Sequence, residues 1–157
     1  MKLYPRIALA ISLSGVAMFT SATDIDDLPP LAGDIARPVD ADYLVHDIGR
    51  SAEAYRSDDG REIVLDNGLV RRTWRLAPNG ACVGFDNLMT GQSMLRSVRP
   101  EARVTIDGVA YDVGGLTGQP NHAFLTPAWL DEMEADAGAM RLVGFDSQTP
   151  LFIFLIL

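Results

Sequence analysis

Residues 62–76 read EIVLDNGLVRRTWRL, and residues 102–113 read ARVTIDGVAYDV. Apolar and polar residues alternate around a dipeptide that favours chain reversal, Asn-Gly at 67–68 in the first stretch and Asp-Gly at 107–108 in the second. Glycine adopts the positive φ of a tight turn without steric cost. Both stretches are therefore predicted to be β-hairpins, and the second carries the clearest hairpin signal in the chain.

Further turn signals continue the antiparallel pattern after the first hairpin. The Pro-Asn-Gly sequence at 78–80 predicts a turn into a strand at residues 81–85, and residues 87–91 break that strand. Within the first hairpin, Arg72 shares a face with Trp74, so its charge needs a partner or a route to solvent. The sequence thus predicts a mainly β protein, an antiparallel β-sandwich.

One short helix is predicted after these strands. Thr126 can cap its N-terminus, and Pro127 suits the first helical position, where the missing N–H costs no hydrogen bond. Apolar residues recur at helical spacing as far as residue 137, and Gly138 offers a C-terminal cap. Four acidic side chains are expected on the solvated face of this helix: Asp131, Glu132, Glu134 and Asp136.

Residues 1–22 have the pattern of a cleaved secretory signal, with an uncleaved anchor as the alternative. Lys2 and Arg6 precede an uncharged, mostly apolar run at residues 7–19, and small residues follow it for cleavage. The run is shorter than the about 20 apolar residues that a membrane-spanning helix needs. We therefore expect an exported protein, periplasmic or extracellular, that keeps no membrane contact after signal cleavage.

The rest of the sequence divides into two parts. Residues 23–50 are rich in Pro and Asp and predict a linker or extended segment, since proline disfavours helices and interior strands. Residues 51–157 are predicted to form the β-sandwich module. The module ends in an apolar run, residues 151–157, which as a strand would need cover on both faces. We expect the sandwich to be incomplete and its C-terminal end truncated; a buried terminal strand in an intact domain is the alternative.

Composition and motifs argue against several classes of function. The 13 basic and 21 acidic residues give a net charge of −8, which repels nucleic-acid phosphates. Cys82 is the one cysteine, and its apolar neighbours predict a buried thiol that acts as a small apolar filler. The Gly-rich stretch at 114–118 lacks the spacing of a phosphate-binding loop and predicts a flexible or close-packed loop. No catalytic residue, cofactor or metal site is assigned from the sequence.

Three residues are candidates for sugar contact. Sugar rings present C–H faces that stack on indole, so Trp74 and Trp129 are the candidate platforms. His122 lies in a predicted loop before the helix, where it can touch a ligand; an ordinary solvated histidine is the alternative. Both tryptophans also fit patterns typical of a core, and a core role remains open for each.

The sequence also resembles a known family through a series of structural phrases between residues 55 and 144. The phrases are at residues 62–74, 87–91, 99–102 and 114–120. Together they resemble the N-terminal β-sandwich region of exported bacterial glycoside hydrolases of the α-galactosidase (melibiase) type. In that family the sandwich precedes a (β/α)₈ barrel, and the barrel carries two catalytic Asp residues.

The resemblance implies a non-catalytic N-terminal module of a secreted carbohydrate-active enzyme, truncated before the catalytic barrel. Because the barrel is absent from this sequence, no catalytic residue is carried over. Its implied partners are carbohydrate and a missing C-terminal catalytic domain. The alternative is a free-standing secreted β domain that binds carbohydrate or another protein.

Overall fold

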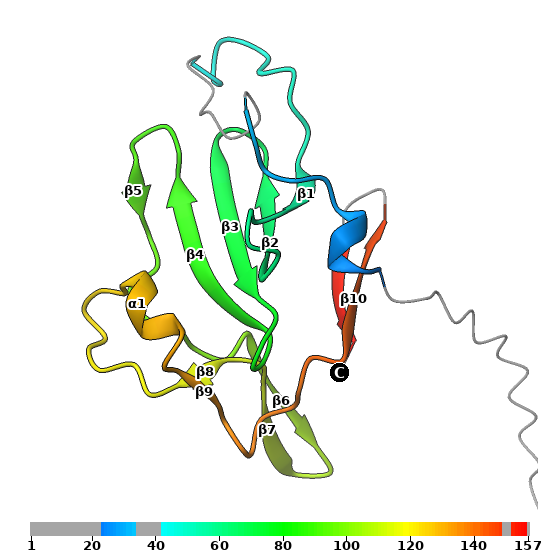
Figure 1. Ribbon diagram of the computed structural model, residues 1–157, viewed down its shortest axis with the longest axis vertical. Helices are drawn as coiled ribbons and strands as arrows, with labels where there is room; N and C mark the ends of the chain where they lie inside the picture. The colour runs from blue at the N-terminus through cyan, green and yellow to red at the C-terminus, as the bar shows by residue number, and fades with distance from the viewer. Residues whose placement is uncertain (1–22, 34–41, 149–151, 157) are drawn as a thin grey trace, which may run out of the picture.

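The computed structural model describes residues 23–33, 42–148 and 152–156. The predicted mainly β fold is confirmed, with antiparallel sheets in a sandwich-like arrangement and one short helix (Figure 1). The predicted signal at residues 1–22 lies outside the described residues, as do residues 34–41 of the predicted linker. In the described ranges, no helix has the length and apolar character needed to cross a membrane.

The largest sheet has five strands, each antiparallel to its neighbours, in the order β1-β2-β3-β4-β5. Their bounds are Glu53–Arg56 (β1), Glu62–Asp66 (β2), Val70–Arg75 (β3), Ala81–Asn87 (β4) and Gln92–Ser93 (β5). The first predicted hairpin is confirmed, since β2 and β3 pair with Glu62 opposite Arg75. Between β3 and β4 the register shifts, so that Thr73 lies opposite Gly84 but Trp74 lies opposite Cys82. Such a bulge bends the strand locally and redirects its side chains.

Among the described residues, three two-stranded sheets, one 3₁₀ turn and the short α-helix complete the fold. The paired strands are β6 (Ala102–Ile106) with β7 (Val109–Val113), β8 (Leu116–Thr117) with β9 (Glu134–Ala135), and β10 (Gly144–Gln148) with β11 (Phe152–Ile156). The helices are the 3₁₀ turn η1 (Ile25–Asp27) and α1 (Pro127–Leu130). In Figure 1 the β6–β7 hairpin extends from the lower end of the molecule, and β10–β11 lies beside η1.

The second predicted hairpin is confirmed as β6–β7. Both residues of its turn have positive φ, 51° at Asp107 and 80° at Gly108. This is the combination that a two-residue type I′ turn requires. The alternation of apolar and polar residues therefore predicts this hairpin correctly from local sequence alone.

The predicted helix is much shorter than expected. It ends at Leu130, and Glu134–Ala135 instead forms β9, which pairs with β8. The prediction of helix as far as residue 137 is therefore wrong. The physical reason is tertiary: Met133 is buried beside Leu116, and pairing with β8 holds the chain after Met133 in an extended conformation. Thr126 stands at the N-cap, although its side chain makes no capping hydrogen bond.

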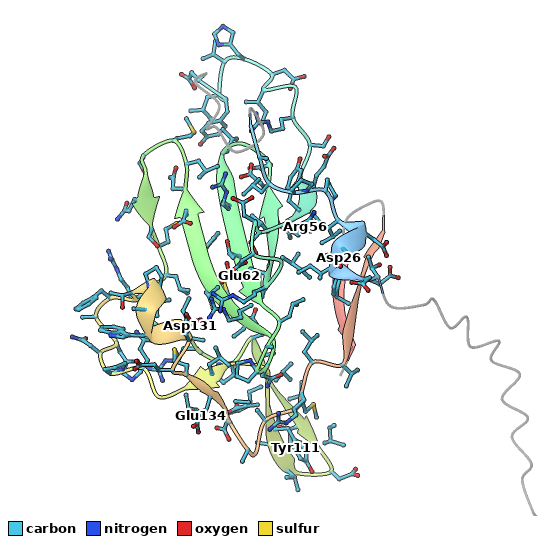
Figure 2. All side chains as sticks on the ribbon, viewed as in Figure 1. Asp26, Arg56, Glu62, Tyr111, Asp131 and Glu134 are labelled. Atoms are coloured by element: carbon cyan, nitrogen blue, oxygen red, sulfur yellow. The ribbon has the colours of Figure 1, made fainter. Side chains whose placement is uncertain are left out.

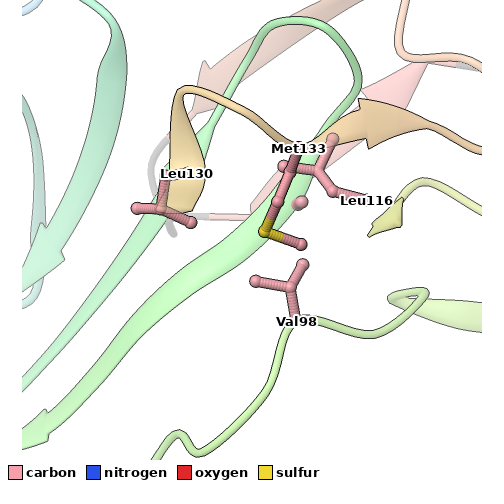
Figure 3. Close-up of a cluster of buried hydrophobic side chains, with 5 residues drawn as sticks. Val98, Leu116, Leu130 and Met133 are labelled. Atoms are coloured by element: carbon pink, nitrogen blue, oxygen red, sulfur yellow. The ribbon is translucent and has the colours of Figure 1, made fainter. Parts of the chain in front are cut away.

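Two clusters of buried apolar side chains form the core. The first, shown in Figure 3, joins β4, β8, α1 and the segment before β6; it comprises Ala81, Val98, Leu116, Leu130 and Met133. The second joins the chain after η1 to β1, β2 and β10; it comprises Leu28, Ala54, Ile63 and Phe145. Fully burying an aliphatic side chain contributes about 1.5–3 kcal/mol. The first cluster fixes α1 and the loop before it, and these carry the candidate site.

Candidate functional site

Trp74 is held on the five-stranded sheet by two polar contacts. Its indole N–H donates to Oε2 of Glu101 at 3.1 Å, and the Arg72 guanidinium lies 4.4 Å from the centre of its ring. The side chain is half-buried. The N–H of Trp74 is therefore already used, and a cation covers its ring.

Glu101 connects three groups of the β3–β4 pair. One carboxylate oxygen accepts from the Cys82 backbone N–H at 2.7 Å, and the other accepts from Arg72 at 2.9 Å as well as from Trp74. The Glu101 side chain is only 13% exposed. It is the partner that the sequence required for Arg72. No sequence signal identifies Glu101 as this partner, because it lies 29 residues away, in the segment just before β6.

Trp129 lies in a different setting, on α1. Its ring stacks against Phe124, with centroids 5.1 Å apart and planes inclined by 35°. Phe124 is 46% exposed and Trp129 is half-buried. Within the described part of the chain, the Trp129 N–H donates to no group. The pair thus offers solvent an apolar face beside an available hydrogen-bond donor.

Gln119 fixes the loop that carries Phe124 and His122. Its side chain is buried; the amide nitrogen donates to the carbonyl oxygens of Phe124 at 3.0 Å and Arg96 at 3.1 Å, and the oxygen accepts from the Val98 N–H at 2.9 Å. These bonds tie the loop to the segment before β6. The sequence analysis missed Gln119, because an amide in a loop carries no distinguishing pattern.

His122 lines a hollow of about 300 Å³. The charged side chains on its wall come from Arg99, Asp112 and Asp136. Arg103 binds Asp112 through Nε and Nη2 of its guanidinium group, at 2.6 and 3.0 Å, and lowers the pKa of that carboxyl. The charged or titratable side chains of this hollow that have no ion-pair partner among the described residues are therefore Arg99, His122 and Asp136. Arg99 and His122 can donate to hydroxyl or carboxylate oxygens, and Asp136 can accept from hydroxyl groups.

The Gly-rich stretch at 114–118 forms one wall of the hollow and is close-packed. Gly115 has φ of 87°, and its N–H donates to the carbonyl of Gly80 at 2.8 Å. A β-carbon at this position would lie 2.7 Å from the backbone nitrogen of Pro100. Only glycine allows this approach. The wall is therefore rigid backbone.

Asp131 is exposed, as expected for the acidic cluster, and it also forms two ion pairs. It accepts from Arg75 and from Arg61, each at 2.8 Å, and these two hydrogen bonds hold its pKa below the usual range. Arg75 is buried, with 7% of its side chain exposed, and also binds Glu62 at 2.9 Å. In Figure 2, Asp131 lies at the end of α1 that is nearer to the sheet carrying Glu62. Asp131 thus links the end of α1 to β3 and to the turn before β2. Glu132, Glu134 and Asp136 are exposed, as expected.

Cys82 is buried, as predicted. Burial raises the pKa of its thiol, and the sulfur contacts the Arg72 side chain and the Gly84 carbonyl, each at 3.4 Å. A thiol with a raised pKa is a poor nucleophile at neutral pH. In the ranges that the structure describes, no three His, Cys, Asp or Glu side chains are grouped so that they could hold a metal ion.

The structure separates the three candidate sugar contacts. Trp129 and His122 are carried by α1 and the loop that Gln119 holds, whereas Trp74 is enclosed by Arg72 and Glu101 on β3. The sequence treats both tryptophans alike and does not single out Phe124. Comparison of the chain with models of protein families, with curated proteins and with solved structures finds no match.

Proposed function

We propose that this chain is a non-catalytic β module of a secreted carbohydrate-active enzyme of the α-galactosidase-like type. In this proposal it contacts sugar through Trp129, Phe124 and His122. The observation that carries the proposal is the stacked Phe124–Trp129 pair, which is partly exposed on a loop and helix that the core holds in place.

The aromatic pair supplies the apolar part of the interaction. The C–H faces of a sugar ring pack on an aromatic surface, and Phe124 leaves nearly half of its surface open to such contact. Trp129 adds an N–H that no described group accepts, so a hydroxyl of the ligand can accept it. A platform with an adjacent donor suits a polar ring that also has apolar faces.

Preorganisation favours the same conclusion. Four hydrogen bonds between the Gln119 side chain and backbone groups fix the loop that presents Phe124 and His122. A loop already held in place loses less conformational entropy when it binds a ligand. The hollow beside His122 then supplies polar groups for sugar hydroxyls.

In this proposal, catalysis is carried out by a barrel domain that accompanies the module. The signal expected at residues 1–22 directs the export of the module. The support is the resemblance of residues 55–144 to the sandwich that precedes such a barrel in the α-galactosidase type. The described residues supply binding groups and no assigned acid–base pair.

The test is a calorimetric titration of the folded protein with galactosides and plant polysaccharides. We expect binding, and we expect Trp129→Ala to weaken it at least tenfold, which corresponds to about 1.4 kcal/mol. Tyr43→Ala is the matched control, because Tyr43 is an exposed aromatic residue outside the site, and it should bind like the parent. Absence of binding by the folded parent protein would remove the proposal.

A second candidate function is a protein-interaction domain. On the β6–β7 hairpin, Ile106 and Val109 at the turn each leave about half of their surface exposed. Exposed apolar residues on a projecting hairpin are suited to contact with another protein. Two results together would favour this function. The folded protein would bind none of the sugars tested, and Ile106→Asp would abolish capture of a co-purifying protein domain.

A further inference from the structure

A second hollow is also lined by Arg99. It has a volume of about 330 Å³, a size suited to one small ligand. Arg99 and Pro100 line both this hollow and the one beside His122, so the two are adjacent. The side chains that matter in the second hollow are those of Arg72, Phe85, Leu95, Ser97, Arg99 and Glu101.

The backbone that carries Arg99 is held from both sides. On one side of Arg99, the Val98 N–H donates to the buried Gln119 side chain at 2.9 Å. On the other, the carboxylate of Glu101 is bound to the β3–β4 pair. Gly115 packs against the backbone between them, since a β-carbon there would meet Pro100 at 2.7 Å. Arg99 thus projects from a fixed position.

The hollow has an excess of positive charge in a chain whose net charge is −8. The charge of Arg72 is balanced by Glu101 at 2.9 Å, and both oxygens of that carboxylate are already used. Arg99 is exposed, and within the described residues no carboxylate pairs with it. Burial raises the pKa of the Cys82 thiol, so this residue adds no negative charge at neutral pH. Arg99 is left as a cation that can bind a carboxylate with two parallel hydrogen bonds.

The remaining wall is partly apolar. Phe85 is 37% exposed, and Arg72 lies 6.0 Å from the centre of its ring. Leu95 adds an aliphatic surface, and Ser97 adds a hydroxyl. The hollow therefore combines an unpaired guanidinium with an aromatic face, which suits a ligand that has both a carboxylate and apolar C–H groups.

We propose that this hollow binds the uronic acid unit of an acidic glycan, with its carboxylate on Arg99 and its ring against Phe85. The neighbouring sugar then occupies the hollow beside His122, because the two share Arg99. This inference rests on the proposed carbohydrate binding and specifies the class of glycan.

The test compares digalacturonate with neutral digalactose, which bear carboxylates and hydroxymethyl groups respectively at C6. Both are titrated calorimetrically at one pH and ionic strength, with sodium acetate as a third ligand. We expect digalacturonate to bind at least tenfold more tightly than digalactose, and acetate to bind too weakly to compete. The preference should disappear in Arg99→Gln and fall to an intermediate value in Arg99→Lys, which keeps the charge but loses the bidentate geometry.

Arg141→Gln is the control, because Arg141 is also exposed and unpaired within the described residues but lies outside both hollows. It should keep the full preference. Any of three results would overturn the inference. The parent could bind the two disaccharides equally well, Arg141→Gln could reduce the preference as much as Arg99→Gln does, or acetate could compete at the same concentration as digalacturonate. If digalactose binds in a Trp129-dependent manner without any preference for digalacturonate, the inference fails and the proposed function stands. If neither disaccharide binds the folded protein, both fail.

Discussion

The two tryptophans of this chain have surroundings of opposite kinds. Trp74 donates its N–H to Glu101 and carries Arg72 over its ring, so its polar and apolar groups both serve contacts within the fold. Trp129 stacks on the exposed Phe124, and its N–H has no acceptor among the described residues. The comparison shows that the same residue type contributes to stability in one place and offers a surface in the other. What separates them is whether the groups around each ring are already satisfied.

The largest expected loss of stability comes from removing Glu101, the residue that holds Trp74. Replacing Glu101 by Ala leaves the Cys82 N–H, the Arg72 guanidinium and the Trp74 N–H without their acceptor. Glu101 is 13% exposed and Arg72 is 44% exposed, so the cost comes mainly from buried donors left without an acceptor, about 1–3 kcal/mol. We expect Glu101→Ala to lower the free energy of unfolding by this amount in urea denaturation. Glu132→Ala, which removes an exposed carboxylate, should change it little.

If Glu101→Ala lowers the free energy of unfolding no more than Glu132→Ala does, Glu101 does not stabilise the surroundings of Trp74. A large loss that left the Trp74 resonances unchanged would contradict the account as well. Either result would remove the distinction between the two tryptophans.

A smaller effect is expected from the hairpin that follows Glu101. Gly108 has φ of 80° and open space around its α-carbon, so Gly108→Val is penalised by backbone strain alone, about 1–2 kcal/mol. The Glu101 N–H donates to the Val113 carbonyl, so disturbing the hairpin should affect Trp74 more than Trp129. Thermal denaturation gives the loss, and indole chemical shifts give its location. Gly108→Asn is the control, since Asn tolerates this conformation; a Val variant that melts like the parent would contradict the turn assignment.

The smallest expected effect is a pH dependence of the melting temperature that comes from Asp131, at the end of the helix that carries Trp129. Arg75 and Arg61 lower the pKa of Asp131 below its ordinary value of 3.8. A carboxylate with a depressed pKa in the folded state stabilises the protein above its unfolded pKa, and this contribution is lost as the pH falls further. The melting temperature of the parent should therefore exceed that of Asp131→Asn at pH 6, and the gap should narrow below pH 3.8.

Glu132→Gln serves as the control for this titration, because Glu132 is the exposed neighbour of Asp131. It should follow the parent at every pH. If the difference in melting temperature between the parent and Asp131→Asn is the same at pH 6 and at pH 2.5, the ion pairs of Asp131 with the two arginines do not stabilise the fold.

Local sequence predicts the parts of this fold that local forces determine. Alternation and the turn residues at 67–68 and 107–108 predict both hairpins, because strand pairing follows directly from the turn. The length of α1 could not be predicted, since burial of Met133 and pairing with β8 override helical spacing.

The candidate site was only partly predictable for the same reason. The sequence predicts Trp74, Trp129 and His122 alike as candidates for sugar contact. Only the fold separates Trp74 from the other two, because its acceptor Glu101 lies 27 residues away in the sequence. Phe124 and Gln119 act through packing and backbone hydrogen bonds, which leave no pattern in the sequence. The availability of Arg99 depends on which carboxylates are already paired, and only the three-dimensional arrangement decides that.

The most direct test of sugar binding uses the two indole N–H signals in a ¹H–¹⁵N spectrum, one from each tryptophan. They are assigned with Trp129→Phe and followed during titration with a galacto-oligosaccharide. We predict that the Trp129 signal moves with saturation, because its N–H has no acceptor among the described residues and can donate to the ligand. The Trp74 signal should stay in place, because that N–H is bonded to Glu101. Movement of the Trp74 signal alone, or of neither signal in the folded protein, would contradict it.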